Sequence, residues 1–361
     1  MKNIRLFIVR ITFFILLHCA ASFIFSTVSC VTPRATGSLN HILSINDLKN
    51  RKEYVWEEAW TKPFNELIVS WNAKRPPVGK FVFYVSLKNG KWAPWRKLAQ
   101  WGAKGQKTFV NTKDKYIHTK HVRIETQKKV RARGFRIKVV AQGGASLNGV
   151  KALFASLSRL NQFKIEKFPY NFSSKLIKGV PRCSQMWVDH ERRGDFCSPT
   201  STSIIIRYLN EKLDCKTKKQ YLPLRDQVKV FAKQTHDDSY LDIHGNWVLN
   251  VAQAYDDTNG RALFKVARLN SFEELHGYLR QNIPVAVSIR GKLRGGYKNY
   301  KDGHFVVVVG WSQKKQAVLC IDPVFRNSRQ MLRGYRVSDF MKAWGRSKNL
   351  SYIAMPQRAI S

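Results

Sequence analysis

Residues 303–323 read GHFVVVVGWSQKKQAVLCIDP, two apolar runs separated by the polar segment SQKKQ. Both runs are almost free of polar residues, which is typical of β-strands that are buried on both faces. The polar segment between them is short enough to form the turn of an antiparallel hairpin. The stretch therefore predicts a hairpin in the interior of a sheet.

The open end of this hairpin carries a histidine and a carboxylate. His304 begins the first strand and Asp322 ends the second. If the turn is centred near Gln313, the two residues lie directly opposite each other; if it is centred near Lys314, Asp322 faces Val306 and the histidine is its diagonal neighbour. Opposed Cβ atoms are about 4.5–5.5 Å apart and diagonal ones about 7–8 Å. In either register the carboxylate can orient the imidazole. The alternative is a solvated strand end, because packing alone does not explain the pair.

A cysteine lies at the expected start of a helix in residues 194–209, GDFCSPTSTSIIIRYL. Pro199 and small hydroxylated residues surround Cys197, and an apolar run follows. The N-terminus of a helix carries about half a positive charge and free N–H groups, which stabilise a thiolate. Cys197 is therefore a candidate nucleophile, with His304 as its base and Asp322 as the residue that orients the base.

An amide side chain upstream of the cysteine adds a possible oxyanion hole. Gln185 lies twelve residues before Cys197, in the segment VPRCSQMW. Acyl-transfer enzymes stabilise the oxyanion of a tetrahedral intermediate with preorganised hydrogen-bond donors. The side-chain amide of Gln185 and the backbone N–H of Cys197 are expected to be these donors.

Three separated segments resemble a known family. VPRCSQ…CSPTSTSIIIRYL, IPVAVSI and GHFVVVVGW…VLCIDP, within residues 180–330, are similar to the papain-superfamily cysteine peptidases related to the bacteriocin-processing, double-glycine leader peptidases, and most of all to their stand-alone secreted members. The resemblance implies that Cys197 is the nucleophile and His304 its base. It also implies that Asp322 orients the base and that Gln185 lies in the oxyanion hole. Transporter-linked relatives carry membrane and ATPase domains, whose signatures this sequence lacks, so bacteriocin processing is not favoured.

Residues 165–361 combine helix-like stretches with the buried strands. Ser271 is the expected N-cap of one helix, with Glu274 at the capping-box position. Helical stretches come first and strands later, which indicates an α+β domain, and the resemblance implies a papain-like fold for it. The expected helices lie within residues 197–210, 223–235, 245–258 and 271–282, and the expected strands within 283–289 and 303–323.

Residues 50–160 have a different pattern, in which apolar residues alternate with polar ones. Phe81, Phe83, Val85 and Leu87 fall on one face of a strand, for example. Segments rich in glycine and proline separate such runs, which is typical of an antiparallel β-sandwich or barrel. We therefore expect a β-sandwich-like accessory domain before the peptidase-like domain.

The accessory domain holds six tryptophans, Trp56, Trp60, Trp71, Trp92, Trp95 and Trp101. Most are expected to be core or sheet-packing residues. Trp92 and Trp95 lie in the turn-like segment KWAPWRKL, so they are the pair that could stack on sugar rings of a polymer.

Residues 1–30 have the features of a secretory signal peptide: a basic start, the apolar stretch ITFFILLHCAASFIF and small residues up to Cys30. The stretch is short for a membrane span, which needs about 20 apolar residues. An uncleaved anchor and a lipoprotein-type cleavage at Cys30 remain alternatives. Each of them predicts export to the periplasm, the cell envelope or the medium.

The formal net charge is +39, and the basic residues are spread along the whole chain. No helix-turn-helix, zinc-finger or stacking-aromatic signature accompanies them, so we do not expect a nucleic-acid partner. An exported protein of this charge is expected to bind an anionic envelope polymer or membrane surface. The alternative is a solvated basic surface without a partner.

Three further cysteines follow the predicted signal peptide besides Cys197. If Cys197 is free, Cys183, Cys215 and Cys320 allow at most one disulfide, in which Cys183 pairs with Cys215 or Cys320.

The segment HDDSYLDIH, residues 236–244, matches no zinc or calcium template. We interpret it as a solvated loop, and we expect neither a metal nor another cofactor.

These observations predict an exported cysteine peptidase that hydrolyses peptide or other amide bonds. The thiolate attacks the carbonyl, the imidazolium protonates the leaving amine, and water hydrolyses the thioester of the acyl-enzyme. The alternative is an envelope-binding protein that keeps the papain-like fold and is either non-catalytic or transfers the acyl group to an amine.

Overall fold

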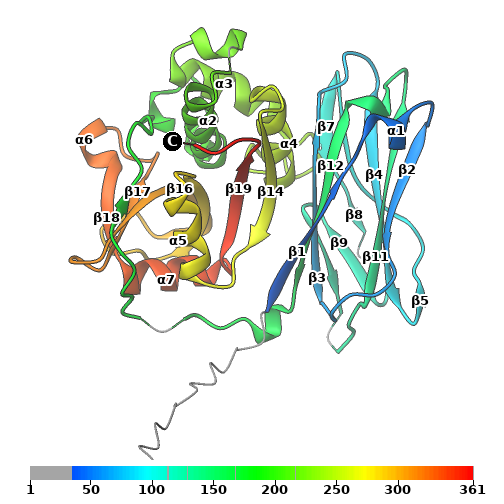
Figure 1. Cartoon of the computed structure of the whole chain (residues 1–361), viewed down its shortest axis with the longest axis horizontal. Coiled ribbons are helices and arrows are strands. Elements are labelled where there is room, and N and C mark those ends of the chain that lie inside the picture. The colour runs from blue at the N-terminus through cyan, green and yellow to red at the C-terminus, as the bar shows by residue number, and fades with distance from the viewer. Residues whose placement is uncertain (1–34, 112–113, 128, 167, 216, 361) are drawn as a thin grey trace, which may run out of the picture. The chain divides into compact units, whose positions relative to one another are not determined.

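The computed structural model describes residues 35–111, 114–127, 129–166, 168–215 and 217–360. The predicted signal peptide or anchor, residues 1–30, lies outside the described residues, and so does the expectation about Cys30. The described residues fall within one structural unit, Arg34–Ser361. In this unit, a region of antiparallel sheets comes first along the chain and a region of mixed helices and strands follows (Figure 1).

Two antiparallel sheets form the first region. The pairing of β1 with β12 means that it begins at Thr36, before the expected boundary at residue 50. The first sheet has the order β1 (Thr36–Ile42), β12 (Val150–Ser158), β3 (Glu66–Ala73), β10 (Arg123–Thr126), β9 (Ile117–Lys120) and β8 (Val110–Asn111). The second has the order β2 (Glu53–Glu58), β11 (Gly134–Gln142), β4 (Lys80–Asn89), β6 (Arg96–Gly102) and β7 (Gly105–Thr108), with β5 (Lys91–Trp92) beside β4. The short helix α1 (Ile45–Leu48) lies between β1 and β2 in sequence.

The alternating pattern of β4 places its aromatic residues in a core shared by the two sheets. Trp71 of β3 stacks on Phe83 of β4, with ring centroids 4.0 Å apart. Every residue of β3 is buried, because its other face contacts the second region. There the side-chain amide of Asn72 exchanges two hydrogen bonds with the backbone of Phe264, of 2.8 and 2.7 Å. This amide therefore satisfies backbone groups of a strand in the second region.

The second region has one antiparallel sheet of seven strands. Its order is β14 (Ala262–Arg268), β19 (Leu350–Pro356), β15 (Val285–Gly291), β16 (Tyr300–Ser312), β17 (Ala317–Ile321) and β18 (Leu332–Arg336), with β13 (Lys175–Leu176) also paired to β16. The helices of this region are α2 (Cys197–Lys212), α3 (Leu224–Thr235), α4 (Trp247–Asp257), α5 (Phe272–Arg280), α6 (Ser328–Met331) and α7 (Val337–Arg346). None of the helices in the described residues is long and apolar enough to cross a membrane.

The four helices expected from the sequence are α2, α3, α4 and α5. The side chain of Ser271 caps α5 by accepting from the backbone N–H of Glu274. The carboxylate of Glu274 accepts from the backbone N–H of Asn270, one residue before the cap, so the reciprocal bond of a capping box is absent from this helix. The sequence pattern thus predicted the N-cap Ser271 correctly, but not the hydrogen-bond partner of the Glu274 carboxylate.

The expected order of helices first and strands later is wrong. Strand β14 precedes α5, and α6 and α7 interrupt the later strands. The sequence of β14, ALFKVAR, contains two basic residues and therefore does not have the pattern of a buried strand. Every residue of the strand is nevertheless buried. Nζ of Lys265 reaches Oγ of Ser38 at 3.1 Å, and Arg268 pairs with Glu66. Partners in the first region therefore make two cations tolerable in a buried strand.

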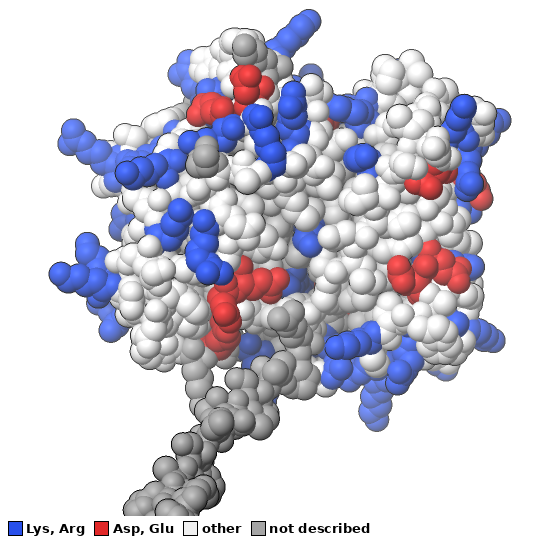
Figure 2. Space-filling view, in the orientation of Figure 1, with Lys and Arg blue, Asp and Glu red and all other residues white. Residues whose placement is uncertain are grey.

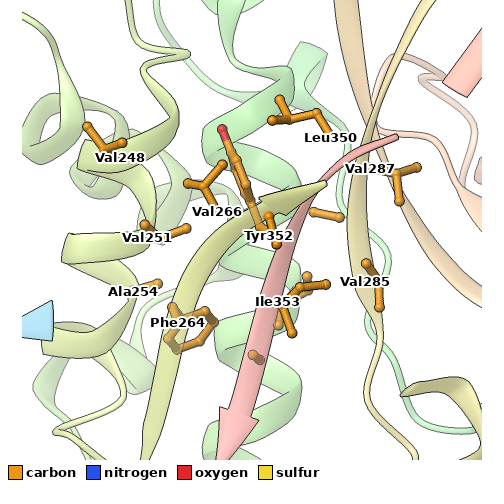
Figure 3. Close-up of a cluster of buried hydrophobic side chains, with 14 of the residues drawn as sticks. Val248, Val251, Ala254, Phe264, Val266, Val285, Val287, Leu350, Tyr352 and Ile353 are labelled. Carbon is orange, nitrogen blue, oxygen red and sulfur yellow. The ribbon is translucent and has the colours of Figure 1, made fainter. Parts of the chain in front are cut away.

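Apolar side chains join helix α4 to the sheet (Figure 3). Val248, Val251 and Ala254 of α4 pack beside Phe264 and Val266 of β14. Further into the sheet, the cluster continues through Val285 and Val287 of β15 and Leu350, Tyr352 and Ile353 of β19. All ten side chains are buried, so this cluster is the core that supports the strands beside α2.

Candidate active site

Cys197 is the first residue of α2, as its sequence context predicts. It is half-buried, whereas the small hydroxylated residues that follow it are buried. Oγ of Ser198 lies 2.9 Å from the hydroxyl of Tyr352 on β19, and Oγ of Ser201 donates to the carbonyl of Phe305 on β16 at 3.2 Å. Small side chains thus allow the start of α2 to lie directly against the sheet and to hydrogen-bond with it.

The hairpin of β16 and β17 has the second of the two registers considered. Val307 pairs with Ile321 and Val308 with Cys320, so the continuation of β17 brings Asp322 opposite Val306. The register then shifts at a bulge before Gly310. A Cβ atom on Gly310 would lie 2.4 Å from the carbonyl oxygen of Lys175 in β13, so the close approach of this strand requires glycine.

His304 and Asp322 form a buried pair in this register. Nε2 of His304 donates to Oδ1 of Asp322 at 2.7 Å. The second carboxylate oxygen accepts from the hydroxyl of Tyr335 at 2.6 Å and from that of Tyr300 at 3.3 Å. The backbone N–H of Val324 donates to Oδ1 at 3.2 Å. The carboxylate is therefore held in one orientation by four donors.

His304 also interacts with the Cys197 thiol, and each group shifts the pKa of the other. Because Nε2 faces Asp322, Nδ1 is the nitrogen left to face the thiol. Gly303 precedes the histidine and has a φ of 97°, in the region that favours glycine. This conformation coincides with an irregularity in the pairing of β15 with β16 between Ile289 and Gly291. The backbone therefore departs from regular strand geometry next to His304.

The three side chains shift one another's pKa in the direction that charges them all. Burial by itself opposes ionisation of each group. The hydrogen bond and charge of His304 nevertheless hold the pKa of the Cys197 thiol below its ordinary value. Burial lowers the pKa of His304, but the charge and hydrogen bond of Asp322 raise it to about 9. Burial also raises the pKa of Asp322, while His304 and Tyr335 bring it below its usual range. The arrangement favours a thiolate, an imidazolium and a carboxylate at neutral pH.

A cavity of about 640 Å³ opens beside these residues. Cys197 and His304 line it on the side of the second region. Glu66 and Arg123 line it from strands β3 and β10 of the first region. Both regions therefore build the space in which a substrate would meet the thiol.

Gln185 is buried in the short helical turn Gln185–Trp187 and does not line this cavity. Its Nε2 donates to the carbonyls of Arg193 and Gly194, at 3.1 and 2.7 Å. Its Oε1 is buried without a hydrogen-bond partner among the described residues. In this arrangement the amide fixes the segment before Cys197, and both of its hydrogens are already engaged.

Residues 177–352 match the Peptidase_C39 like family. We refer to this segment as the C39-like region. No curated protein and no solved structure matches the chain. The match supports a hydrolase of the cysteine-peptidase type at the level of the family, and it contains Gln185, Cys197, His304 and Asp322 within its bounds.

Two tyrosines of the C39-like region, Tyr300 and Tyr335, also belong to the site and were not predicted from the sequence. Tyr300 lies four residues before His304 on the same strand, so both rings project from one face, and they stack with centroids 4.4 Å apart. That spacing was a usable signal. Tyr335 lies on β18, and only the pairing of β18 with β17 brings it to the carboxylate. Burial and the charge of Asp322 raise the pKa of both phenols, so they remain neutral donors.

The remaining cysteines of the C39-like region are not part of the site. Cys183, Cys215 and Cys320 are buried, and none of the four cysteines in the described residues forms a disulfide. The pairing of Cys183 with Cys215 or Cys320 is therefore not present. Burial raises the pKa of all three, to about 12 for Cys183, so they are thiols at neutral pH.

The acidic segment 236–244 is a loop, as expected, but it is only partly solvated. Asp237 is completely buried and accepts hydrogen bonds from the backbone and side chain of Thr108 in β7 and from Asn246. Asp238 accepts from the backbone of Gln106. These carboxylates attach the segment to the first region, because they accept hydrogen bonds from backbone N–H groups of the edge strand β7.

Trp92 and Trp95 are only partly exposed and already have cationic neighbours. The guanidinium carbon of Arg136 lies 4.8 Å from the Trp92 ring centroid and 4.4 Å from that of Trp95. Lys138 lies 5.0 Å from the Trp95 ring centroid. Basic side chains therefore contact ring faces that a sugar would need.

Proposed function

We propose that this protein is a cysteine peptidase that hydrolyses a peptide or related amide bond through a thioester. The observation that carries the proposal is the placement of Cys197 at the wall of a cavity beside the hydrogen-bonded pair of His304 and Asp322, with the pKa of the thiol lowered and that of the imidazole raised. The match of residues 177–352 to the Peptidase_C39 like family supports the same class of chemistry.

In the proposed reaction, the thiolate sulfur of Cys197 attacks the carbonyl carbon of the substrate. The carbonyl oxygen becomes an oxyanion, which the backbone N–H groups at the start of α2 stabilise. The imidazolium of His304 gives its proton to the leaving amine, and the C–N bond breaks to leave a thioester. The neutral imidazole then takes a proton from water, whose oxygen displaces the sulfur and releases the carboxylic acid. Asp322 stays ionised and keeps the imidazole oriented.

We retain Gln185 as the proposed side-chain donor of the oxyanion hole. This role requires its amide to turn away from the carbonyls of Arg193 and Gly194, to which both hydrogens now donate. Its present contacts suit a second task, which is to fix the backbone just before the nucleophile.

We also propose that the C-terminal region has a papain-like fold and that the two N-terminal sheets form a β-sandwich-like accessory domain. The contact of Trp71 with Phe83 between the sheets supports the latter. Export remains a proposal that depends on the signal-like sequence of residues 1–30.

A peptide library tests the proposed activity. We expect the protein to cleave at least one peptide and a thioester of the acyl fragment at Cys197 to be detectable by mass spectrometry after rapid quenching. Cys197→Ala should abolish both, whereas Cys215→Ala, which changes a buried thiol away from the cavity, should retain them. Cleavage by the Cys197→Ala protein, or no cleavage by a folded native protein whose thiol reacts no faster than a free cysteine, would refute the proposal.

A further inference from the structure

The cavity beside the nucleophile has several cations at its edge. Two stretches of the second region provide them: the end of β15 through the loop to the start of β16, and the end of α7 with the turn that follows it. All of these side chains are at least partly exposed. We call this set the basic rim; it consists of Arg290, Lys298, Lys301, Arg346 and Lys348.

The acidic residues of the cavity do not neutralise the basic rim. Glu66 pairs with Arg268, with Nε to Oε1 at 2.6 Å. Glu125 pairs with Lys120 and Arg123, each at 2.5 Å. Asp195 pairs with Arg192 at 3.1 Å. Asp302 is the remaining acidic residue of the lining, and in the part of the chain that the structure describes no carboxylate oxygen lies within 4.0 Å of a basic-rim nitrogen.

Another part of the lining has a different character. Ile243, Gly245 and Trp247 line it together with His244. The guanidinium carbon of Arg123, from β10, lies 5.9 Å from the centroid of the Trp247 ring, so the first region closes this side of the cavity. The cavity is therefore asymmetric: cations without a carboxylate partner lie on the His304 side, whereas the part formed by residues 243–247 carries no lysine, arginine, aspartate or glutamate.

The basic rim is close to the reacting groups through Tyr300. Lys298 and Lys301 flank this tyrosine, whose ring stacks on His304 with an interplanar angle of 8°. Cations in a concave, partly desolvated site attract anions more strongly than the same cations on an open surface. Charges at this place act on whatever segment of substrate lies against the histidine.

We infer that the substrate is an acidic peptide, whose carboxylates contact the basic rim on one side of the scissile bond. The inference rests on the proposed function, because it assigns a substrate class to the same site. It makes Lys298 and Lys301 specificity-determining residues, and it assigns the less charged wall to apolar or uncharged residues of the peptide.

Two alkylating reagents test the charge of the site without a known substrate. Iodoacetate and iodoacetamide both alkylate a thiolate with loss of iodide, but only the first carries a negative charge. The ratio of their rates at Cys197 therefore reports the local potential. The test variant is Lys298→Gln/Lys301→Gln. Its matched control is Lys314→Gln/Lys315→Gln, which removes two exposed lysines from the turn at the other end of β16.

We expect the native ratio of iodoacetate to iodoacetamide to exceed that of a short neutral cysteine peptide. It should fall roughly twofold for each charge removed from the basic rim at low salt. The control variant should keep the native ratio, and 1 M salt should remove most of the difference. An equal ratio in both variants would overturn the inference about acidic substrates. Slow labelling of Cys197 by the neutral reagent would instead overturn the proposed function.

Protection by peptides tests recognition directly. An octapeptide of alternating alanine and glutamate should slow the reaction of Cys197 with iodoacetamide, and the corresponding lysine peptide should not. Protection by the glutamate peptide should weaken several-fold in the Lys298→Gln/Lys301→Gln protein and not in the control variant. Equal protection by the two peptides, while the neutral reagent still labels Cys197 rapidly, would overturn the acidic-peptide assignment and leave the nucleophile intact.

Discussion

The phenolic hydroxyl of Tyr335 donates to Oδ2 of Asp322 at 2.6 Å, while His304 occupies the other oxygen of the same carboxylate. The carboxylate is completely buried. A buried charge is tolerated when its lone pairs are satisfied. Tyr335 therefore helps to keep Asp322 ionised at the place where the imidazolium needs it.

Tyr335→Phe should destabilise the protein by about 1.5–3 kcal/mol at pH 7, because it removes a hydrogen bond to a charged group. The folded-state pKa of Asp322 lies below its usual range. Its stabilising contribution is thus present above the unfolded-state pKa of about 3.9 and is lost as the pH falls through the folded-state pKa. The difference between variant and native protein should therefore shrink in acid. Denaturant unfolding at several pH values measures it.

Tyr208→Phe is the matched control for this experiment. Tyr208 is equally buried, but its hydroxyl donates to the neutral carbonyl of Asn282 at 3.0 Å. Its loss should cost about 0.5–1.5 kcal/mol, with no dependence on acid. The same pH dependence in both variants would show that Tyr335 is only a packing residue.

Asp322→Asn should shift the acid limb of Cys197 alkylation to higher pH. Burial disfavours the imidazolium of His304, and the charge of Asp322 is what raises its pKa to about 9. Without that charge the imidazolium is lost at lower pH, so the thiolate that it stabilises becomes more basic. Below both thiol pKa values the rate should fall roughly tenfold for each unit of the shift. The rate of iodoacetamide labelling as a function of pH measures this shift. An unchanged profile with an intact fold would show that Asp322 does not influence the thiol.

Cys197 should react with iodoacetamide near neutral pH faster than Cys183, Cys215 or Cys320. His304 lowers the pKa of the first, and burial raises the pKa of the other three. Site-resolved mass spectrometry after short exposures gives the four rates. In denaturant the four rates should converge, because the differences belong to the folded state. Equal rates in the folded protein would remove the nucleophile assignment.

Arg268→Met should cost about 3–5 kcal/mol, because it leaves the charge of Glu66 buried without its main partner. Neither side chain of this pair is more than 5% exposed, and the pair connects β3 to β14. The double variant Glu66→Met/Arg268→Met should recover much of the loss. Denaturant unfolding of the native protein, both single variants and the double variant yields the coupling.

An exposed pair is the control for Arg268. Lys229 lies 3.5 Å from Asp189, whose side chain is fully exposed. Lys229→Met should cost no more than about 1 kcal/mol. If Arg268→Met were equally mild, the two regions would not depend on the buried pair.

The protein should bind anionic surfaces through diffuse charge. Figure 2 shows basic side chains on the left and right halves of the visible face, with acidic ones in a few small groups. The net charge is +39. Screening lengths fall from about 10 Å at 0.1 M salt to about 3 Å at 1 M. Retention of the Cys197→Ala protein on purified cell walls and on anionic vesicles should therefore fall steeply over that range. Neutral vesicles are the control, and no retention at low salt would contradict the prediction.

Trp95→Ala should leave this retention unchanged, because Arg136 and Lys138 already contact the ring. Retention that resisted 1 M salt and disappeared in this variant would instead indicate stacking on sugar.

Periodicity and residue type made much of the second region predictable. The uninterrupted apolar runs of residues 303–323 predicted β16 and β17, and the small polar residues around Cys197 predicted the start of α2. Such patterns are local, because a strand or helix must place its own apolar residues toward a core. They also predicted that His304 and Asp322 lie at one end of a hairpin.

The sequence by itself thus determined which residues are chemically suited to a cysteine site and in which elements they lie. The tertiary structure alone decided the register that joins His304 to Asp322, the arrival of Tyr335 from β18 and the engagement of Gln185 with backbone carbonyls. It also decided that strands β3 and β10 complete the cavity. The physical reason is that close packing between whole elements, as at the bulge before Gly310, fixes such contacts without leaving a periodic signal in the sequence.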